Sequence, residues 1–181
     1  MEKSKIVSTL IEKEQDVINW VQEYGSQFWE YGPSGKWTSG QQIVHLVQSM
    51  RPVNKVLKVP KFLLKMKFGK SNRPSRNYNQ IKEKYKTRLQ EVGDVVSPFS
   101  DKMPVISQAE TEKWMGMFSR QMAQLEKSFN KWSESDLDKY IAPHPLLGMM
   151  TMREIIVWTA IHTEHHLTSM KGRADSSGKD N

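Results

Sequence analysis

The chain has 181 residues, a length typical of a single domain with its own core, and 37% of them are hydrophobic. It has no cysteine, which excludes disulfides, thiolate metal ligands and a cysteine nucleophile. It has no apolar run of about 18 residues and no signal-peptide pattern at its N-terminus, so we expect no membrane span and a cytoplasmic location.

The net charge of +7 is concentrated in one segment. Between Lys55 and Arg88, twelve Lys and Arg residues accompany one acidic residue, Glu83, which gives +11 there and −4 in the rest of the chain. Aromatic residues such as Tyr78 and Tyr85 are interleaved with the basic ones, so the segment is a candidate surface for nucleic acid or an anionic membrane. The alternative, and the more common outcome, is a solvated lysine-rich loop.

Two long helices are predicted in the N-terminal part. Apolar residues recur at helical spacing from about Ser4 to Phe28. After a break rich in Gly and Pro at residues 31–35, Thr38-Ser-Gly-Gln41 forms a capping box that starts the second helix. We expect this helix to end near Met50, ahead of Pro52.

Three further helices are predicted after the basic, proline-containing stretch. A thin apolar face predicts a peripheral helix over about Tyr78 to Val92, ended by Gly93. A strong apolar stripe predicts a helix over about Gln108 to Trp132. A connection over residues 133–150 leads to the last helix, which opens with the capping box Thr151-Met-Arg-Glu154 and reaches Met170.

No internal repeat and no convincing strand is found in the sequence. The expected fold is therefore all-α: a four-helix bundle with one extra peripheral helix, occupying residues 1–171 as one domain. The residues after Gly172 have nothing to bury, so residues 172–181 are expected to form a disordered tail.

The last helix carries His162-Thr-Glu-His-His166. Two imidazoles four residues apart point the same way from successive turns, at a separation that one metal ion can bridge. Burying them on this apolar helix is costly unless their nitrogens are satisfied. A metal ion would satisfy them, and core histidines bonded to nearby carbonyls are the alternative. His45, on the second helix and off its main apolar stripe, is the third candidate ligand, although an exposed histidine is common at such a position.

Other polar residues are assigned to the surroundings of this site. Glu164 lies about 160° from the His162/His166 face and is excluded as a ligand. His165 lies about 100° from His166, so it is a candidate for contacts around the metal or with substrate. His144, between two prolines, is a candidate of the same kind, with capping of a helix as its alternative role.

Gln41 and Gln48 stand roughly one turn on either side of His45, where they could orient ligands or substrate. Three imidazoles leave a coordination position open, which is typical of catalytic rather than structural zinc. Zinc, nickel and ferrous iron all accept imidazole, so the residues alone do not choose among Zn, Ni and Fe.

Three stretches together resemble the DinB-like (YfiT-type) superfamily of bacterial four-helix-bundle proteins: residues 36–46, 143–148 and 151–167. The family pattern has one histidine on the second helix and two on the last, which fall on His45, His162 and His166 here. The resemblance implies that these three hold a divalent metal at one end of the bundle, often in a homodimer. It also implies kinship with metal-dependent thiol S-transferases, which activate a low-molecular-weight thiol such as bacillithiol or mycothiol.

The leading hypothesis is a metal-dependent enzyme of the thiol S-transferase or hydrolase type, in which the metal lowers the pKa of a small-molecule thiol or of water. A thiol brought by the substrate would fit the absence of cysteine. No general base is evident in the sequence. The alternatives are a non-catalytic metal- or ligand-binding stress protein, and a nucleic-acid or membrane-surface binder that uses the basic segment.

Overall fold

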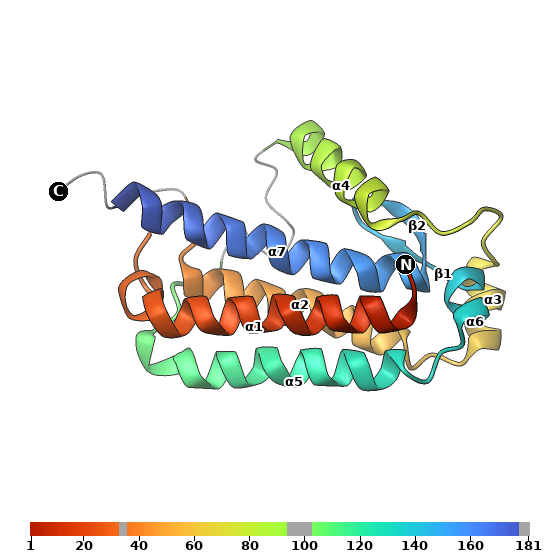
Figure 1. The fold of residues 1–181 in the computed structure, drawn as a ribbon, viewed down its shortest axis with the longest axis horizontal. Helices are drawn as coiled ribbons and strands as arrows, with labels where there is room; N and C mark the ends of the chain where they lie inside the picture. The colour runs from red at the N-terminus through yellow and green to blue at the C-terminus, as the bar shows by residue number, and fades with distance from the viewer. Residues whose placement is uncertain (33–35, 94–102, 178–181) are drawn as a thin grey trace.

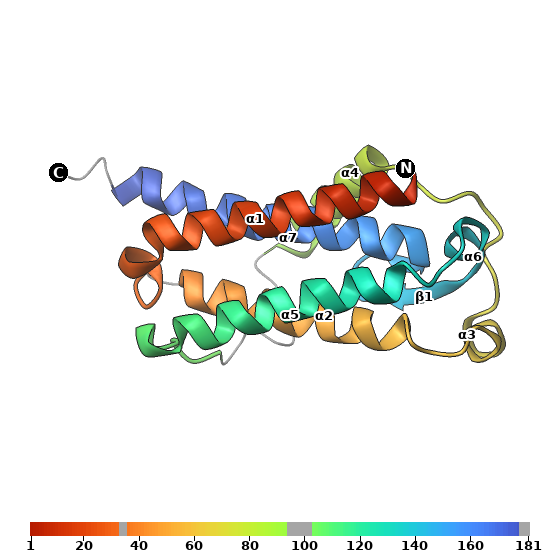
Figure 2. The ribbon, with the colours of Figure 1, turned by 60° about the horizontal axis from the view of Figure 1, so that its bottom comes forward.

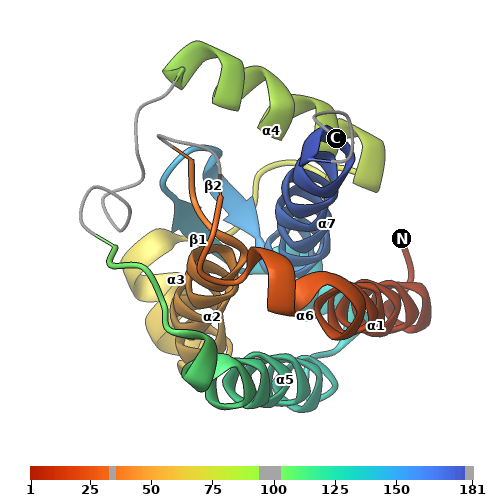
Figure 3. The same cartoon turned by 90° about the vertical axis from the view of Figure 1, so that its left-hand side faces the viewer.

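A computed structural model describes residues 1–32, 36–93 and 103–177. Four long helices run alongside one another: α1 (Lys3–Phe28), α2 (Ser39–Val56), α5 (Thr111–Phe129) and α7 (Met152–Ser177) (Figures 1 and 2). Helix α4 (Tyr78–Val92) lies outside this group and packs on α7 (Figure 3). The predicted all-α bundle with a peripheral helix is confirmed.

One apolar core lies between the four long helices. Helix α2 packs on α5 and on α7, and α1 packs on α7 and on α5. Apolar residues at helical spacing supply this core, as the sequence pattern predicted. Its largest fully buried side chains include Ile6, Trp29, Ile43, Leu46, Phe118, Leu125 and Phe129.

Both predicted capping boxes are present, and they start the two helices that carry the candidate histidines. At the start of α2, Gln41 Oε1 accepts from Thr38 N at 2.8 Å and Thr38 Oγ1 accepts from Gln41 N at 3.3 Å. At the start of α7, Glu154 Oε2 accepts from Thr151 N at 3.1 Å and Thr151 Oγ1 accepts from Glu154 N at 3.2 Å. Each box satisfies backbone N–H groups that a helix start leaves without a partner.

The predicted end of the second helix near Met50 is wrong, because α2 continues through Pro52 to Val56. A proline inside a helix costs roughly 3 kcal/mol, since it removes one backbone hydrogen bond and crowds the preceding turn. Burial of Val53 and of Leu57, which follows the helix, contributes roughly 1.5–3 kcal/mol each and offsets that cost. Asn54 adds a hydrogen bond across to α5, where its Nδ2 donates to the carbonyl of Gln121 at 3.0 Å.

The expectation of no strand is also wrong. Strands β1 (Ile141–His144) and β2 (Gly148–Thr151) form an antiparallel hairpin, with Ala142 opposite Met150. Each strand has only four residues, too few to display an alternating pattern in the sequence. His144 Nδ1 accepts from the backbone N–H groups of Leu146 and Leu147, at 3.2 and 3.1 Å, and thereby closes the turn.

Three shorter helices were not predicted. Two of them lie in stretches that were expected to be irregular, and the third lies at the start of the helix expected over about Gln108 to Trp132. They are α3 (Lys61–Phe68) in the basic segment, the 3₁₀ turn η1 (Gln108–Glu110) before α5, and α6 (Glu134–Lys139) before the hairpin. Helices α3 and α6 lie at the same end of the bundle (Figures 1 and 2).

Two further predicted helix ends can be compared with the structure. Helix α4 has the predicted bounds and is followed by Gly93, whose φ of 60° is a left-handed conformation that glycine adopts without strain. Helix α7 extends to Ser177, past Gly172, where the disordered tail was expected to begin. Residues 178–181 of that tail lie outside the described residues. In the part of the chain that is described, no helix combines the length and apolar character needed to cross a membrane.

Candidate metal centre

Three imidazoles from two helices meet inside the bundle. His45 comes from α2 and His162 and His166 come from α7, and all three are buried. His162 Nε2 lies 3.2 Å from His45 Nε2 and 3.0 Å from His166 Nε2. One ring nitrogen of each residue lies within 4.8 Å of the other two, so the cluster could hold a metal ion. We call these three residues the histidine triad.

The outer nitrogens of two triad rings face oxygen acceptors. His166 Nδ1 lies 2.9 Å from Gln42 Oε1, which can only accept a hydrogen bond. His162 Nδ1 lies 3.4 Å from Ser49 Oγ, whose own proton is donated to the carbonyl of Leu46 at 2.9 Å. Both rings are therefore best satisfied with the proton on Nδ1, which leaves Nε2 unprotonated and directed at the other imidazoles.

The residues present fit a divalent metal ion. Two unprotonated Nε2 atoms 3.0 Å apart direct lone pairs at each other, which is unfavourable unless a cation lies between them. A tetrahedral zinc ion with Zn–N bonds of about 2.0–2.1 Å would hold two such nitrogens about 3.3 Å apart, close to the observed separations. His45 Nδ1 is buried and has no hydrogen-bond partner among the described residues.

Burial keeps two imidazoles of the triad, His45 and His162, in the form that binds metals. It lowers the pKa of His45 to about 4, and it holds the pKa of His162 well below 6.5 with help from the neighbouring His45. At neutral pH both imidazoles are therefore uncharged, as a metal ligand must be.

Aromatic side chains surround the triad. The Trp37 ring lies 5.0 Å from the His45 ring, between centroids, and the Trp158 ring stacks on His162 at 4.6 Å. Tyr85, from the peripheral helix α4, meets the His162 ring edge-on at 6.1 Å. The peripheral helix thus contributes a wall of the site, and the surroundings of the triad are largely apolar.

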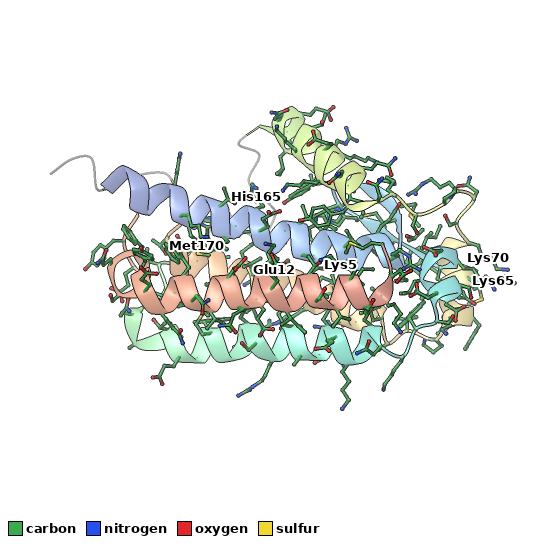
Figure 4. The ribbon with its side chains drawn as sticks, in the orientation of Figure 1. Lys5, Glu12, Lys65, Lys70, His165 and Met170 are labelled. Atoms are coloured by element: carbon green, nitrogen blue, oxygen red, sulfur yellow. The ribbon has the colours of Figure 1, made fainter. Side chains whose placement is uncertain are left out.

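Glu164 faces away from the triad, as the helical spacing indicated. Its Oε2 accepts from Tyr78 Oη at 3.0 Å and from Lys82 Nζ at 2.9 Å, so it ties α7 to α4. His165 is exposed on α7, with its ring 5.2 Å from the His166 ring (Figure 4). His165 thus lies beside the triad without joining it.

His144 is separated from the triad by Trp158. The His144 and Trp158 ring centroids lie 4.2 Å apart, and the Trp158 ring in turn stacks on the His162 ring. His144 Nδ1 accepts two backbone hydrogen bonds in the hairpin turn, so the side chain closes this turn and does not cap a helix, as its alternative role had it. Burial lowers its pKa to about 4, so it is uncharged at neutral pH.

In the described part of the chain, neither of the two glutamines selected from the sequence has its side-chain oxygen hydrogen-bonded to a triad ring. Gln41 uses its oxygen in the capping box, and its Nε2 donates to the carbonyl of Met103 at 2.7 Å. Gln48 is half-buried, and its side-chain oxygen has no hydrogen-bond partner in the described part of the chain. Gln42 and Ser49 were not among the site residues predicted from the sequence. They stand three residues before and four residues after His45, a spacing that places all three side chains on one face of α2.

Comparison with known proteins places the chain in a family. Among curated proteins, none matches the chain significantly. The family model of the DinB superfamily matches residues 10–170, a range that includes all three histidines of the triad. The chain therefore belongs to the DinB superfamily.

Proposed function

We propose that this protein binds one divalent metal ion, Zn, Ni or Fe, through His45, His162 and His166, and that it is an enzyme of the thiol S-transferase or hydrolase type. The observation that carries the proposal is the convergence of three Nε2 atoms, two of them on rings whose Nδ1 faces an oxygen acceptor. Three ligands leave a coordination position for substrate.

In the proposed reaction, the nucleophile would be a small molecule and not a side chain of the protein. A divalent ion held by the triad would lower the pKa of a small-molecule thiol or of water, so that the nucleophile forms near neutral pH. With no cysteine in the chain, a sulfur nucleophile would come from a low-molecular-weight thiol. We favour the thiol for that reason, with water as the alternative nucleophile.

The side chains around the triad have separate tasks in this proposal. Gln42 and Ser49 hold protons on the outer nitrogens of His166 and His162. Trp37 and Tyr85 limit the access of water to the site. Burial raises the pKa of Tyr85, so its phenol stays protonated at neutral pH and cannot serve as the base. His165, exposed beside His166, is the candidate for exchanging protons with solvent or contacting substrate.

Metal content tests the proposal directly. We expect about one Zn, Ni or Fe per purified chain, and its loss in His162→Ala and in His166→Ala. His165→Ala is the matched control, since it removes an imidazole from the same helix outside the triad and should keep the metal. The proposal would be overturned if the purified protein contained no metal and did not bind added divalent ions.

Assays with thiols and electrophiles then separate the enzyme from its alternative. Turnover that depends on both the metal and the triad would support the S-transferase, and hydrolysis without a thiol would support the hydrolase. A metal-loaded protein without turnover would favour a non-catalytic metal- or ligand-binding stress protein. The homodimer implied by the sequence resemblance is tested by light scattering of the same preparation.

A further inference from the structure

Helix α3 presents apolar side chains to solvent. Phe62 is 68% exposed, Met66 is 76% exposed and Leu63 is 36% exposed. The opposite side of the helix is anchored on the bundle by Leu64, which is 1% exposed, and by the half-buried Phe68. The exposed apolar residues are therefore not needed to hold α3 in place.

Lysines border this exposed apolar strip. At 100° per residue, Phe62, Met66 and Leu63 cover about 100° of the helix surface, with Lys65 on one side and Lys67 on the other. Helices that lie in a membrane interface show this arrangement, because the apolar strip enters the boundary while the lysine stems extend along it and keep their charges in the polar layer.

The positive charge around α3 is not neutralised by the protein. Residues 55–70 contain six lysines and no acidic residue. Lys61 pairs with Asp136 at 2.5 Å, whereas Lys58, Lys65, Lys67 and Lys70 are exposed and form no ion pair within the described ranges. Lys65 and Lys70 project from the end of the bundle (Figure 4).

We propose that the exposed face of α3 docks on an anionic membrane surface, with Phe62, Leu63 and Met66 entering the headgroup layer and the four unpaired lysines contacting lipid phosphates. A negative lipid surface complements both features, since it offers phosphates for the lysines and acyl chains for the apolar strip. Nucleic acid offers phosphates too, but its bases need stacking partners, and among the three exposed apolar residues Phe62 alone is aromatic.

The docking face is separate from the histidine triad. Figure 4 shows His165, the neighbour of the triad residue His166, partway along α7, while Lys65 and Lys70 lie at the far end of the bundle. Docking through α3 would thus hold the protein at a membrane without covering the metal centre. With two helical turns in contact, the attachment is reversible.

Co-sedimentation of the full chain with vesicles tests the proposal. We expect binding to vesicles of equal parts phosphatidylglycerol and phosphatidylcholine at low salt, little binding to pure phosphatidylcholine, and loss of binding near 1 M salt, where the Debye length is about 3 Å. The double variant Lys65→Gln/Lys67→Gln should bind roughly 25-fold more weakly, about fivefold per lysine. Its matched control is Lys86→Gln/Lys171→Gln, which removes two exposed lysines from other helices and should bind as the wild type does.

The apolar strip has its own test. Phe62→Ser/Met66→Ser should weaken vesicle binding at least about tenfold, because two side chains no longer leave water. Ile11→Ser is the control, since Ile11 on α1 is 51% exposed and far from α3 in sequence. All three positions are exposed, so folding should be retained, and a thermal melt of each variant checks this.

The absence of cysteine allows a direct probe of insertion. In Phe62→Cys labelled with a polarity-sensitive dye, emission should shift to the blue on anionic vesicles, whereas labelled Ile11→Cys should not respond. Three results would overturn the proposal: no shift in the emission of the label at position 62, a loss of vesicle binding in the control variants as large as in the α3 variants, or no binding of the wild type to anionic vesicles. Binding to a single-stranded oligonucleotide with the same dependence on Lys65 and Lys67, and none to lipid, would overturn it in favour of nucleic acid.

Discussion

Gln42 Oε1 lies 2.9 Å from His166 Nδ1, and this contact joins α2 to α7 beside the histidine triad. Because the amide oxygen can only accept a hydrogen bond, the proton of His166 is held on Nδ1, and Nε2 faces His162. Gln42 is 1% exposed, so water does not offer an equivalent acceptor. The contact therefore determines the orientation and the tautomer of a candidate metal ligand.

Replacing Gln42 should weaken metal binding. We expect Gln42→Leu to lower the affinity for zinc by 10- to 100-fold, the range typical of lost partners of ligating histidines. Competition with a chromogenic chelator measures the affinity. Gln41→Ala is the matched control: it should lower the free energy of unfolding by about 1 kcal/mol through loss of the capping box, with zinc affinity unchanged. Equal affinity of Gln42→Leu and the wild type would contradict the assignment.

Substitution by alanine should change the free energy of unfolding in opposite directions at two helix glycines, Gly40 on α2 and Gly116 on α5. A Cβ at Gly40 would lie 2.9 Å from the backbone oxygen of Trp29, whereas a Cβ at Gly116 on α5 would meet nothing within 4 Å. Gly40→Ala should lower the free energy of unfolding by about 1–3 kcal/mol through overpacking. Gly116→Ala should raise it by about 0.5–1 kcal/mol, because alanine favours the helix. Urea denaturation of both variants tests this, and a Gly40→Ala protein as stable as Gly116→Ala would refute the packing.

Local patterns predicted most of the fold, since they depend on residues three or four apart. The capping boxes at Thr38 and Thr151 and the periodic apolar stripes are patterns of this kind. The passage of α2 through Pro52 was missed because it depends on distant partners. One of them is Trp132, whose Nε1 donates to the carbonyl of Leu57 at 3.1 Å, and neighbouring residues in the sequence do not reveal such a contact.

The candidate site was predicted in part for a similar reason. His162 and His166 are four residues apart, so their common direction is visible in the sequence, whereas the approach of His45 rests on packing between α2 and α7. The choice of Gln41 over Gln42 as the glutamine near the triad could have been avoided from the sequence alone. The capping box already committed the side chain of Gln41 to Thr38, which left Gln42 as the glutamine able to face α7.

Glu154 should make stability depend on pH. It is fully buried and accepts hydrogen bonds from Arg73 at 2.6 and 2.9 Å. Burial alone would raise the pKa of Glu154, but the hydrogen bonds from Arg73 and from the backbone N–H groups of Arg76 and Thr151 together lower it below 4.5. Because the pKa is lower in the folded chain, the stabilisation is fully present above pH 4.5 and is lost as the pH falls through the folded value.

The variant Glu154→Gln isolates this effect. At pH 7 it should lower the free energy of unfolding by about 1–3 kcal/mol, and the difference from the wild type should shrink as the pH falls below 4.5. Urea denaturation of metal-free protein across this range provides the measurement. Glu91→Gln, at an exposed pair with Arg88, should differ little from the wild type at any pH. A constant difference between Glu154→Gln and the wild type would rule out the charged hydrogen bonds as its cause.

Zinc should reverse the order of stability of the wild type and the His162→Leu variant. In metal-free protein, the buried Nε2 of His162 faces the Nε2 atoms of His45 and His166 at 3.2 and 3.0 Å. Leucine has a similar volume and no polar atoms, so His162→Leu should be as stable as the metal-free wild type or more stable. With zinc at about 100 times its dissociation constant, the wild type should gain about 2.7 kcal/mol and the variant nothing, so the wild type becomes the more stable protein.

His144→Leu separates this reversal from a general effect of losing a buried histidine. His144 Nδ1 accepts two backbone hydrogen bonds in the hairpin turn, so leucine there should cost about 1–3 kcal/mol with or without zinc. Thermal melts of the three proteins, with chelator and with zinc, provide the comparison. If His162→Leu were the less stable protein in chelator by as much as His144→Leu, the imidazoles of the triad would be satisfied without a cation. The facing lone pairs would then no longer argue for a metal ion at this site.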